Sequence, residues 1–128
     1  MKSAIRAICA GASVLIVSGC VETARQLPGD ALVPGTGYNA TGRIPCTNQI
    51  GQTMFDCEFG VIRRGGGDAT VVVTLPTGNE RRIEFVRGVP VSADVPAPLR
   101  HQRVGDETYV YIGTIERYRI FDAVIYGG

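Results

Sequence analysis

From residue 38 onward, short runs of β-branched and aromatic residues alternate with clusters of glycine, proline and aspartate. This spacing is typical of strands joined by turns in an antiparallel barrel or sandwich. The best helical candidate, residues 92–102, contains Pro96 and Pro98, each of which costs ~3 kcal/mol inside a helix. The sequence therefore predicts a small all-β domain, mostly a meander, with strands at 38–44, 57–63, 69–75, 79–86, 99–104, 107–112, 115–120 and 122–126.

The pairing of the third and fourth predicted strands follows from their hydrophobic pattern. A three-residue loop at 76–78 places Val71 opposite Ile83 and therefore keeps apolar side chains on one face. The same register pairs Ala69 with Phe85 and puts the glycine at 78 in a left-handed position. Because a shift of one residue turns every side chain to the other face, burial selects this loop over a four-residue one. Residues 89–98 are expected to form a loop.

The first nineteen residues follow a different pattern. Lys2 and Arg6 precede an uncharged stretch at 7–18 that is shorter than the ~20 apolar residues of a membrane-spanning helix. A basic start, a short apolar run and small residues at its end are typical of a secretory signal peptide.

This stretch ends in Val17-Ser18-Gly19-Cys20, which resembles the lipobox of bacterial lipoproteins. The resemblance implies cleavage before Cys20 and a diacylglycerol thioether on its sulfur, and two or more acyl chains make a stable membrane anchor. Val21 stands where an aspartate would resemble an inner-membrane retention signal, which favours the periplasmic face of the outer membrane. The alternative is a secreted protein in which Cys20 is incidental.

The predicted organisation has three parts. Residues 1–19 form the signal peptide, residues 20–37 the lipidated N-terminus and a flexible tether, and residues 38–128 the β domain. The tether contains several prolines and glycines and has no strand or helix periodicity, although 31–33 could pair as an extra edge strand.

Charge excludes several functions. The formal net charge is +1, so no strong field recruits nucleic acid. Once residues 1–19 are removed no lysine remains, from which we expect no Schiff-base chemistry, no phosphate-loop lysine and no polybasic membrane patch. We expect no cofactor.

Cys46 and Cys57 are the cysteines of the predicted domain. An even pair in an oxidising compartment favours a disulfide, which in this loop contributes roughly 3 kcal/mol. The alternatives are a redox pair, which usually has two residues between its cysteines, and half of a zinc site. Here ten residues intervene, and His101 is the single histidine, so the structural disulfide is favoured and no metal site is expected.

Catalytic patterns are weak in this chain. Ser92 and His101, with Asp94 or Asp106 near them in sequence, are the residue types of a serine hydrolase, but no nucleophile-elbow pattern surrounds the serine. The glycine-rich stretch 65–68 leads into a strand, whereas a phosphate loop leads into a helix. We therefore expect a protein that is not an enzyme and keep a hydrolase as an alternative.

Two groups of residues are candidates for binding a partner. Tyr109 and Tyr111 share one strand face and, with Arg117, form an aromatic strip of the kind that anchors interfaces. The alternative is that these tyrosines lie on the rim of a closed barrel. Arg81 and Arg82 could join residues 63–64 in a basic patch for a phosphate or a glycan carboxylate, or could be solvated strand charges.

Two resemblances extend these expectations. The first rests on the stretches Ala40-Thr41-Gly42, Cys57-Glu58-Phe59-Gly60-Val61, Thr74-Leu75-Pro76-Thr77-Gly78 and Asp122 to Gly128. Through these stretches the domain resembles a family of uncharacterised small envelope proteins of Gram-negative bacteria.

The lipobox, tether, cysteine pair and small β domain together resemble the lipoprotein inhibitors of lysozyme, although Ser92-Ala93-Asp94 departs from their inhibitory loop. The sequence predicts a lipid-anchored binding or structural module with an envelope protein or glycan as partner, and a lysozyme inhibitor is the alternative.

Overall fold

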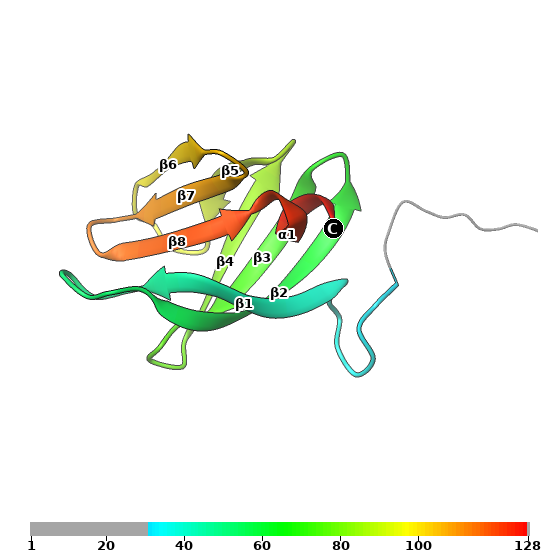
Figure 1. Cartoon of the computed structure of the whole chain (residues 1–128), viewed down its shortest axis with the longest axis horizontal. Coiled ribbons are helices and arrows are strands. Elements are labelled where there is room, and N and C mark those ends of the chain that lie inside the picture. Colours follow the sequence, from blue (N-terminus) through cyan, green and yellow to red (C-terminus); the bar gives the residue numbers. More distant parts are fainter. Residues whose placement is uncertain (1–30, 128) are drawn as a thin grey trace, which may run out of the picture.

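The structure is a computed structural model that describes residues 31–127 and is almost entirely antiparallel β-sheet (Figure 1). Its strands are β1 (Ala40–Thr47), β2 (Phe55–Gly65), β3 (Asp68–Thr74), β4 (Glu80–Val86), β5 (Val89–Ala93), β6 (Leu99–Val104), β7 (Glu107–Ile112) and β8 (Glu116–Phe121). A short helix, α1 (Asp122–Tyr126), follows β8. The predicted signal peptide, Cys20 and most of the predicted tether lie outside the described residues.

The strands form one sheet in the order β5-β4-β3-β2-β1-β8-β7-β6. Every neighbouring pair is antiparallel, and β1 joins the two halves because it pairs with both β2 and β8. The sheet curls until its two edge strands, β5 and β6, approach each other, so that the meander is nearly closed into a barrel (Figure 1). The expected all-β meander is confirmed.

The predicted β3–β4 register is also confirmed. Val71 pairs with Ile83 and Ala69 with Phe85, and all four side chains are almost completely buried. Gly78 has φ +94°, the left-handed conformation expected of the loop. The glycine-rich stretch 65–68 forms the turn between β2 and β3, which matches its interpretation as a hairpin connection.

Residues 89–98 are not entirely a loop, contrary to the sequence prediction. Val89–Ala93 form β5, which follows β4 through a two-residue turn with φ +50° at Arg87 and +81° at Gly88. Positive φ at both central residues is the geometry that matches the twist of a hairpin. The amide of Arg87 donates to the Asp68 carboxylate (2.9 Å), which supports a conformation that arginine rarely adopts.

The strand predicted at 122–126 is wrong, because these residues form α1. Val124 and Ile125 are buried against the core, and α1 packs on β2, β3 and β8. Arg63 donates hydrogen bonds to the carbonyl oxygens of Val124 (3.0 Å) and Ala123 (3.1 Å), satisfying groups that a strand would pair with a neighbour. β-branched residues favour strands, but here the burial of one helical turn decides.

The core lies inside the barrel and is built from alternate residues of the strands, among them Ile44, Val61, Val71, Val73, Ile83, Phe85, Val110, Ile112, Tyr118 and Ile120. α1 lies at the end of the barrel where β8 finishes, and its Tyr126 hydroxyl lies against Gly67 and Gly88. No helix among residues 31–127 is long and apolar enough to span a membrane.

Candidate functional site

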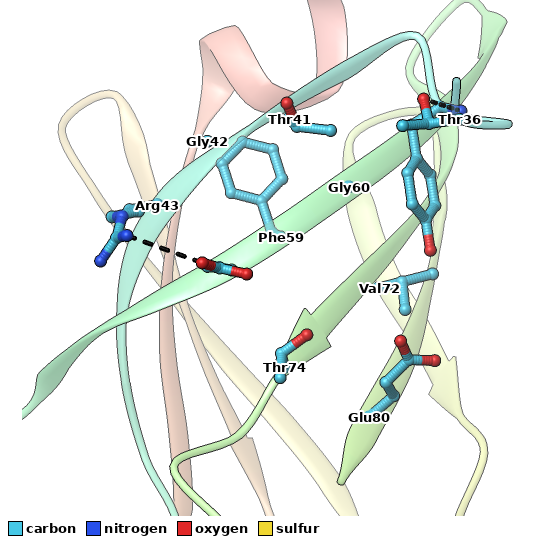
Figure 2. A pocket seen from close by; sticks show the side chains of 11 residues that line it. Thr36, Thr41, Gly42, Arg43, Phe59, Gly60, Val72, Thr74 and Glu80 are labelled. Carbon is cyan, nitrogen blue, oxygen red and sulfur yellow. Dashed lines mark hydrogen bonds and ion pairs between the residues drawn. The ribbon is translucent and has the colours of Figure 1, made fainter. Parts of the chain in front are cut away.

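A groove of about 400 Å³ lies over strands β1, β2 and β3, beside the segment that leads into β1 (Figure 2). We call it the Tyr38–Phe59 groove, after the two aromatic residues that line it, and its other lining residues include Gly42, Gly60 and Val72. The turn at 33–38 positions Tyr38, since the Val33 amide donates to the Tyr38 carbonyl oxygen (2.8 Å). The described residues 31–37 contain no strand, so the alternative extra strand at 31–33 is not formed.

Each aromatic ring of the groove lies over a glycine. A methyl group at Gly60 would overlap the ring of Tyr38, and one at Gly42 would lie 3.1 Å from the Phe59 ring. Figure 2 shows the Phe59 ring beside Gly42. Any larger residue at 60 would therefore push Tyr38 off the strand, so the two glycines allow the rings to lie close to the sheet.

The polar groups of the groove carry more negative than positive charge. Arg43 and Glu58 form an exposed ion pair at 3.6 Å, which Figure 2 draws as a dashed line. The Glu80 carboxylate makes no hydrogen bond or ion pair with any described residue, and it points toward Val72 (Figure 2). A second hollow of about 320 Å³ continues from the groove past Asp56, sharing Arg43, Glu58 and Thr74 with it.

The aromatic strip predicted from the sequence lies on a different surface. The cross-strand pairs of β6, β7 and β8 place Tyr111 between Arg100 and Arg117, and Tyr109 beside Arg119. We call this surface the arginine–tyrosine face. The Arg100 guanidinium lies 5.1 Å from the centre of the Tyr111 ring, and Arg119 lies 5.4 Å from that of Tyr109, both within cation–π range.

Neighbouring groups fix two of these arginines. Arg119 donates to both carboxylate oxygens of Glu107 (2.8 and 3.0 Å), and these hydrogen bonds, opposed by partial burial, lower the pKa of Glu107. Arg117 donates to the carbonyl oxygen of Gln52 (2.8 Å), in the loop between β1 and β2. The guanidinium of Arg100 makes no hydrogen bond or ion pair with described residues, and the residue is exposed. The face therefore holds its aromatic rings in place, and the Arg100 guanidinium, which lies over Tyr111, keeps its hydrogen-bond donors available.

The basic patch considered for Arg81 and Arg82 is not assembled. Strand β3 separates β2 from β4, and Arg63 and Arg64 of β2 bind α1 and Glu84 respectively. Arg82 is exposed on the outside. Arg81 instead reaches across the barrel toward β8.

There Arg81 donates through Nε and Nη2 to the two oxygens of Glu116 (2.9 and 2.8 Å) and through Nη1 to Asp94 (2.8 Å). The hydroxyl of the fully buried Tyr118 donates to Glu116 at 2.6 Å. The hydrogen bonds with Glu116 raise the pKa of Arg81 against the effect of its burial, and burial followed by the hydrogen bond to Glu116 raises the pKa of Tyr118. This cluster occupies the barrel end away from α1 and uses every donor nitrogen of Arg81 internally.

Cys46 and Cys57 form a disulfide between the paired strands β1 and β2, with Cα atoms 5.8 Å apart. Both cysteines are almost completely buried and belong to the core. The predicted structural disulfide is confirmed.

The residue types of a hydrolase are spread over two strands. Ser92 lies exposed on β5 and His101 exposed on β6, and no hydrogen bond joins them within residues 31–127. Asp94 is bonded to Arg81, so the segment Ser92-Ala93-Asp94, compared above with an inhibitory loop, is tied to the barrel interior. No group of three or more metal-ligating side chains occurs among the described residues.

The Tyr38–Phe59 groove was not predicted from the sequence. Tyr38 stood at the start of a predicted strand, and Phe59 and Gly60 belonged to an ordinary strand pattern. The available signal was glycine inside strands, at 42 and 60, which marks a close approach of another group. That approach depends on strand pairing and on the turn at 33–38.

Comparisons of this chain with protein-family models, with curated proteins and with solved structures found no match.

Proposed function

We propose that this protein is a lipid-anchored module of the bacterial cell envelope that is not an enzyme and that holds a partner protein on its arginine–tyrosine face. The observation that carries the proposal is the row Arg100–Tyr111–Arg117, in which a tyrosine lies between two arginines on an outer sheet surface. Tyrosine and arginine dominate the binding energy of protein interfaces because they combine a large apolar area with hydrogen-bond donors.

The charge of the face favours an acidic partner. The face carries three arginines and the carboxylate of Glu107, which is already bound to Arg119, so its net charge is positive. An acidic surface would gain hydrogen bonds from Arg100 and steering by the remaining positive charge. Part of the apolar component is Val104, which is 45% exposed and lies beside this face at the end of β6.

The anchoring half of the proposal rests on Val17-Ser18-Gly19-Cys20, outside the described residues. A lipid at Cys20 would keep the domain near a membrane surface, where a module that holds a partner needs no catalytic group. A periplasmic location at the outer membrane also agrees with the Cys46–Cys57 disulfide, because disulfides persist in oxidising compartments.

The test is site-specific photo-cross-linking in intact bacteria. A photoreactive residue at Gln102, opposite Tyr109, should give one adduct of defined mass, while the same group at exposed Ser92 of β5 should not. Replacing Tyr109 and Tyr111 by alanine should reduce the adduct at least about fivefold, since each ring supplies hot-spot contact area. Arg100→Glu should reduce it further. Equal adduct yields with and without the two tyrosines would overturn the proposal.

A further inference from the structure

We propose that the Tyr38–Phe59 groove is a second binding site, which takes a glycan chain whose sugars are uncharged or carry an amine. This site is independent of the arginine–tyrosine face, because the groove lies over β1, β2 and β3 and the face over β6, β7 and β8.

The aromatic lining suits the apolar faces of sugar rings. Tyr38 and Phe59 are each half-buried, and the glycines beneath them let both rings lie close to the sheet. The C–H groups of a sugar carry partial positive charge and pack against the negative face of an aromatic ring. Val72 at the floor of the groove is only 2% exposed, so the apolar surface open to a ligand comes mainly from the two rings, and the floor carries no charge.

The polar lining suits sugar hydroxyls. The side chains of Thr41, Thr74 and Glu80 line the groove, and none of them makes a hydrogen bond with a described residue. Arg43 and Glu58 form an ion pair that is 63% and 70% exposed and therefore remains open to a ligand. Donors and acceptors placed around an apolar surface fix the orientation of a ligand in its site.

Charge decides which glycans fit. The groove is lined by two carboxylates, Glu58 and Glu80, and by one cation, Arg43, and Asp56 lies in the adjoining hollow, so the surface is negative. A polymer of sugar acids would be repelled, whereas an amine would gain an ion pair with Glu80. Since the two hollows share Arg43, Glu58 and Thr74, a chain longer than one sugar could follow them along the sheet.

An extended peptide fits this surface less well than a glycan. Peptides that bind β-sheets commonly add a strand to a free edge and use main-chain hydrogen bonds for affinity. β2 and β3 are each paired on both sides, whereas β1 pairs with β8 only at Cys46 and Thr47, so residues 40–45 have no second strand partner among the described residues. The groove, however, lies over the face of the three strands and not along that outer edge of β1. Binding within the groove must therefore come from side chains, as glycan recognition does.

The experiment is an NMR titration of the full-length protein, purified in detergent, with three β-1,4- or α-1,4-linked tetramers. The probes are N-acetylglucosamine tetramer, the same tetramer without acetyl groups, and galacturonic acid tetramer. We expect the first to bind, the amine form to bind about threefold more tightly or better, and the acid to bind at least about tenfold more weakly. Amide shifts should concentrate in β1, β2 and β3.

The variants separate stacking from charge. Tyr38→Ala should weaken both binding tetramers at least about tenfold, a loss of about 1.4 kcal/mol. Tyr109→Ala, the same truncation on the arginine–tyrosine face, should stay within about twofold. Gly60→Ala should resemble Tyr38→Ala, because its methyl group overlaps the Tyr38 ring. Glu80→Gln should abolish the preference for the amine while leaving the acetylated tetramer bound.

Three results would overturn the glycan site. These are the absence of binding by both the acetylated and the amine tetramer at millimolar concentration, equal weakening by Tyr38→Ala and Tyr109→Ala, and amide shifts that fall outside β1, β2 and β3. Retained folding of each variant is checked by its amide spectrum. The cross-linking result at Gln102 is unaffected by any of them, so failure of this site and failure of the proposed function are distinguishable.

Discussion

Arg81 on β4 and Glu116 on β8 are joined by two parallel hydrogen bonds across the barrel, although they stand 35 positions apart in the chain. β4 and β8 are separated in the sheet by β3, β2 and β1. The pair therefore links the two halves of a sheet that is not closed by hydrogen bonds between its edge strands. Both side chains are about 15% exposed, so water screens the pair only weakly.

Replacing Arg81 by methionine should destabilise the protein by about 3 kcal/mol, because Glu116 and Asp94 would be left without their cation. Urea unfolding followed by circular dichroism measures this difference. The matched control is Arg82→Met, an exposed neighbour on the same strand, which should change stability by less than about 0.5 kcal/mol. Equal effects of the two substitutions would show that the cross-barrel pair does not hold the fold together.

Lowering the pH should weaken the ion pair between Arg81 and Glu116. Burial alone would raise the pKa of Glu116, but the hydrogen bonds from Arg81 and Tyr118 outweigh it and leave this pKa below the ordinary 4.5. The unfolded chain therefore binds more protons than the native one in this range, so the stabilisation is complete above pH 4.5 and is lost as pH falls through the lower folded pKa. The free energy of unfolding, measured at intervals from pH 7 to pH 2, should therefore decrease as the pH falls below 4.5.

Glu116→Gln provides the control for that titration. It removes the titrating group while Asp94, Glu107 and Asp122, whose pKa values are also lowered, remain. The acid-side loss of stability should become shallower in this variant than in the parent. A parallel pH profile in the two proteins would exclude Glu116 as a source of acid sensitivity.

Opening the Cys46–Cys57 disulfide should cost about 3 kcal/mol in the chain-entropy model for a loop of this length. For a domain of this size, that loss lowers the melting temperature by about 12–24 °C. Differential scanning calorimetry should compare Cys20→Ala with the triple variant that also carries Cys46→Ala and Cys57→Ala, so that Cys20 contributes to neither protein. Indistinguishable melting curves would mean that sheet packing alone supports β1 against β2.

Cys20→Ala should abolish incorporation of labelled palmitate, because the predicted thioether needs the Cys20 sulfur. Because the predicted cleavage site also ends at Cys20, the variant would keep the apolar stretch 7–18, so palmitate labelling is the measurement that reports on the lipid. Cys9→Ala, a cysteine inside the predicted signal peptide, serves as the control and should leave labelling unchanged. Palmitate labelling of the Cys20→Ala protein at the level of the parent would contradict the predicted anchor.

Local pattern determined much of the fold. Alternating apolar residues at Val71, Val73, Ile83 and Phe85 predicted both strands and their register, because a one-residue shift would expose the whole apolar face. The strands β6 and β7 were predicted with their observed bounds, since both are short β-branched or aromatic runs between turns. The Cys46–Cys57 pair was predicted from its number and spacing.

Other features depended on neighbours that are distant in sequence. Asp122–Tyr126 has residues that favour strands, yet it forms α1 because Val124 and Ile125 can be buried at the barrel end while Arg63 binds the helix carbonyls. β5 was missed because Pro90 and the exposed valines give it little alternation, and its hairpin depends on a left-handed arginine held by Asp68.

The sequence by itself determined the strand-rich class, the β3–β4 register and the disulfide, because these follow from short-range periodicity and residue type. Only the tertiary structure decided that Arg81 faces Glu116 across the barrel and that Tyr38 lies on Gly60. Both contacts depend on the curl of the sheet and the path of a turn. These arise from summed packing over the whole domain and leave little trace in any local stretch of sequence.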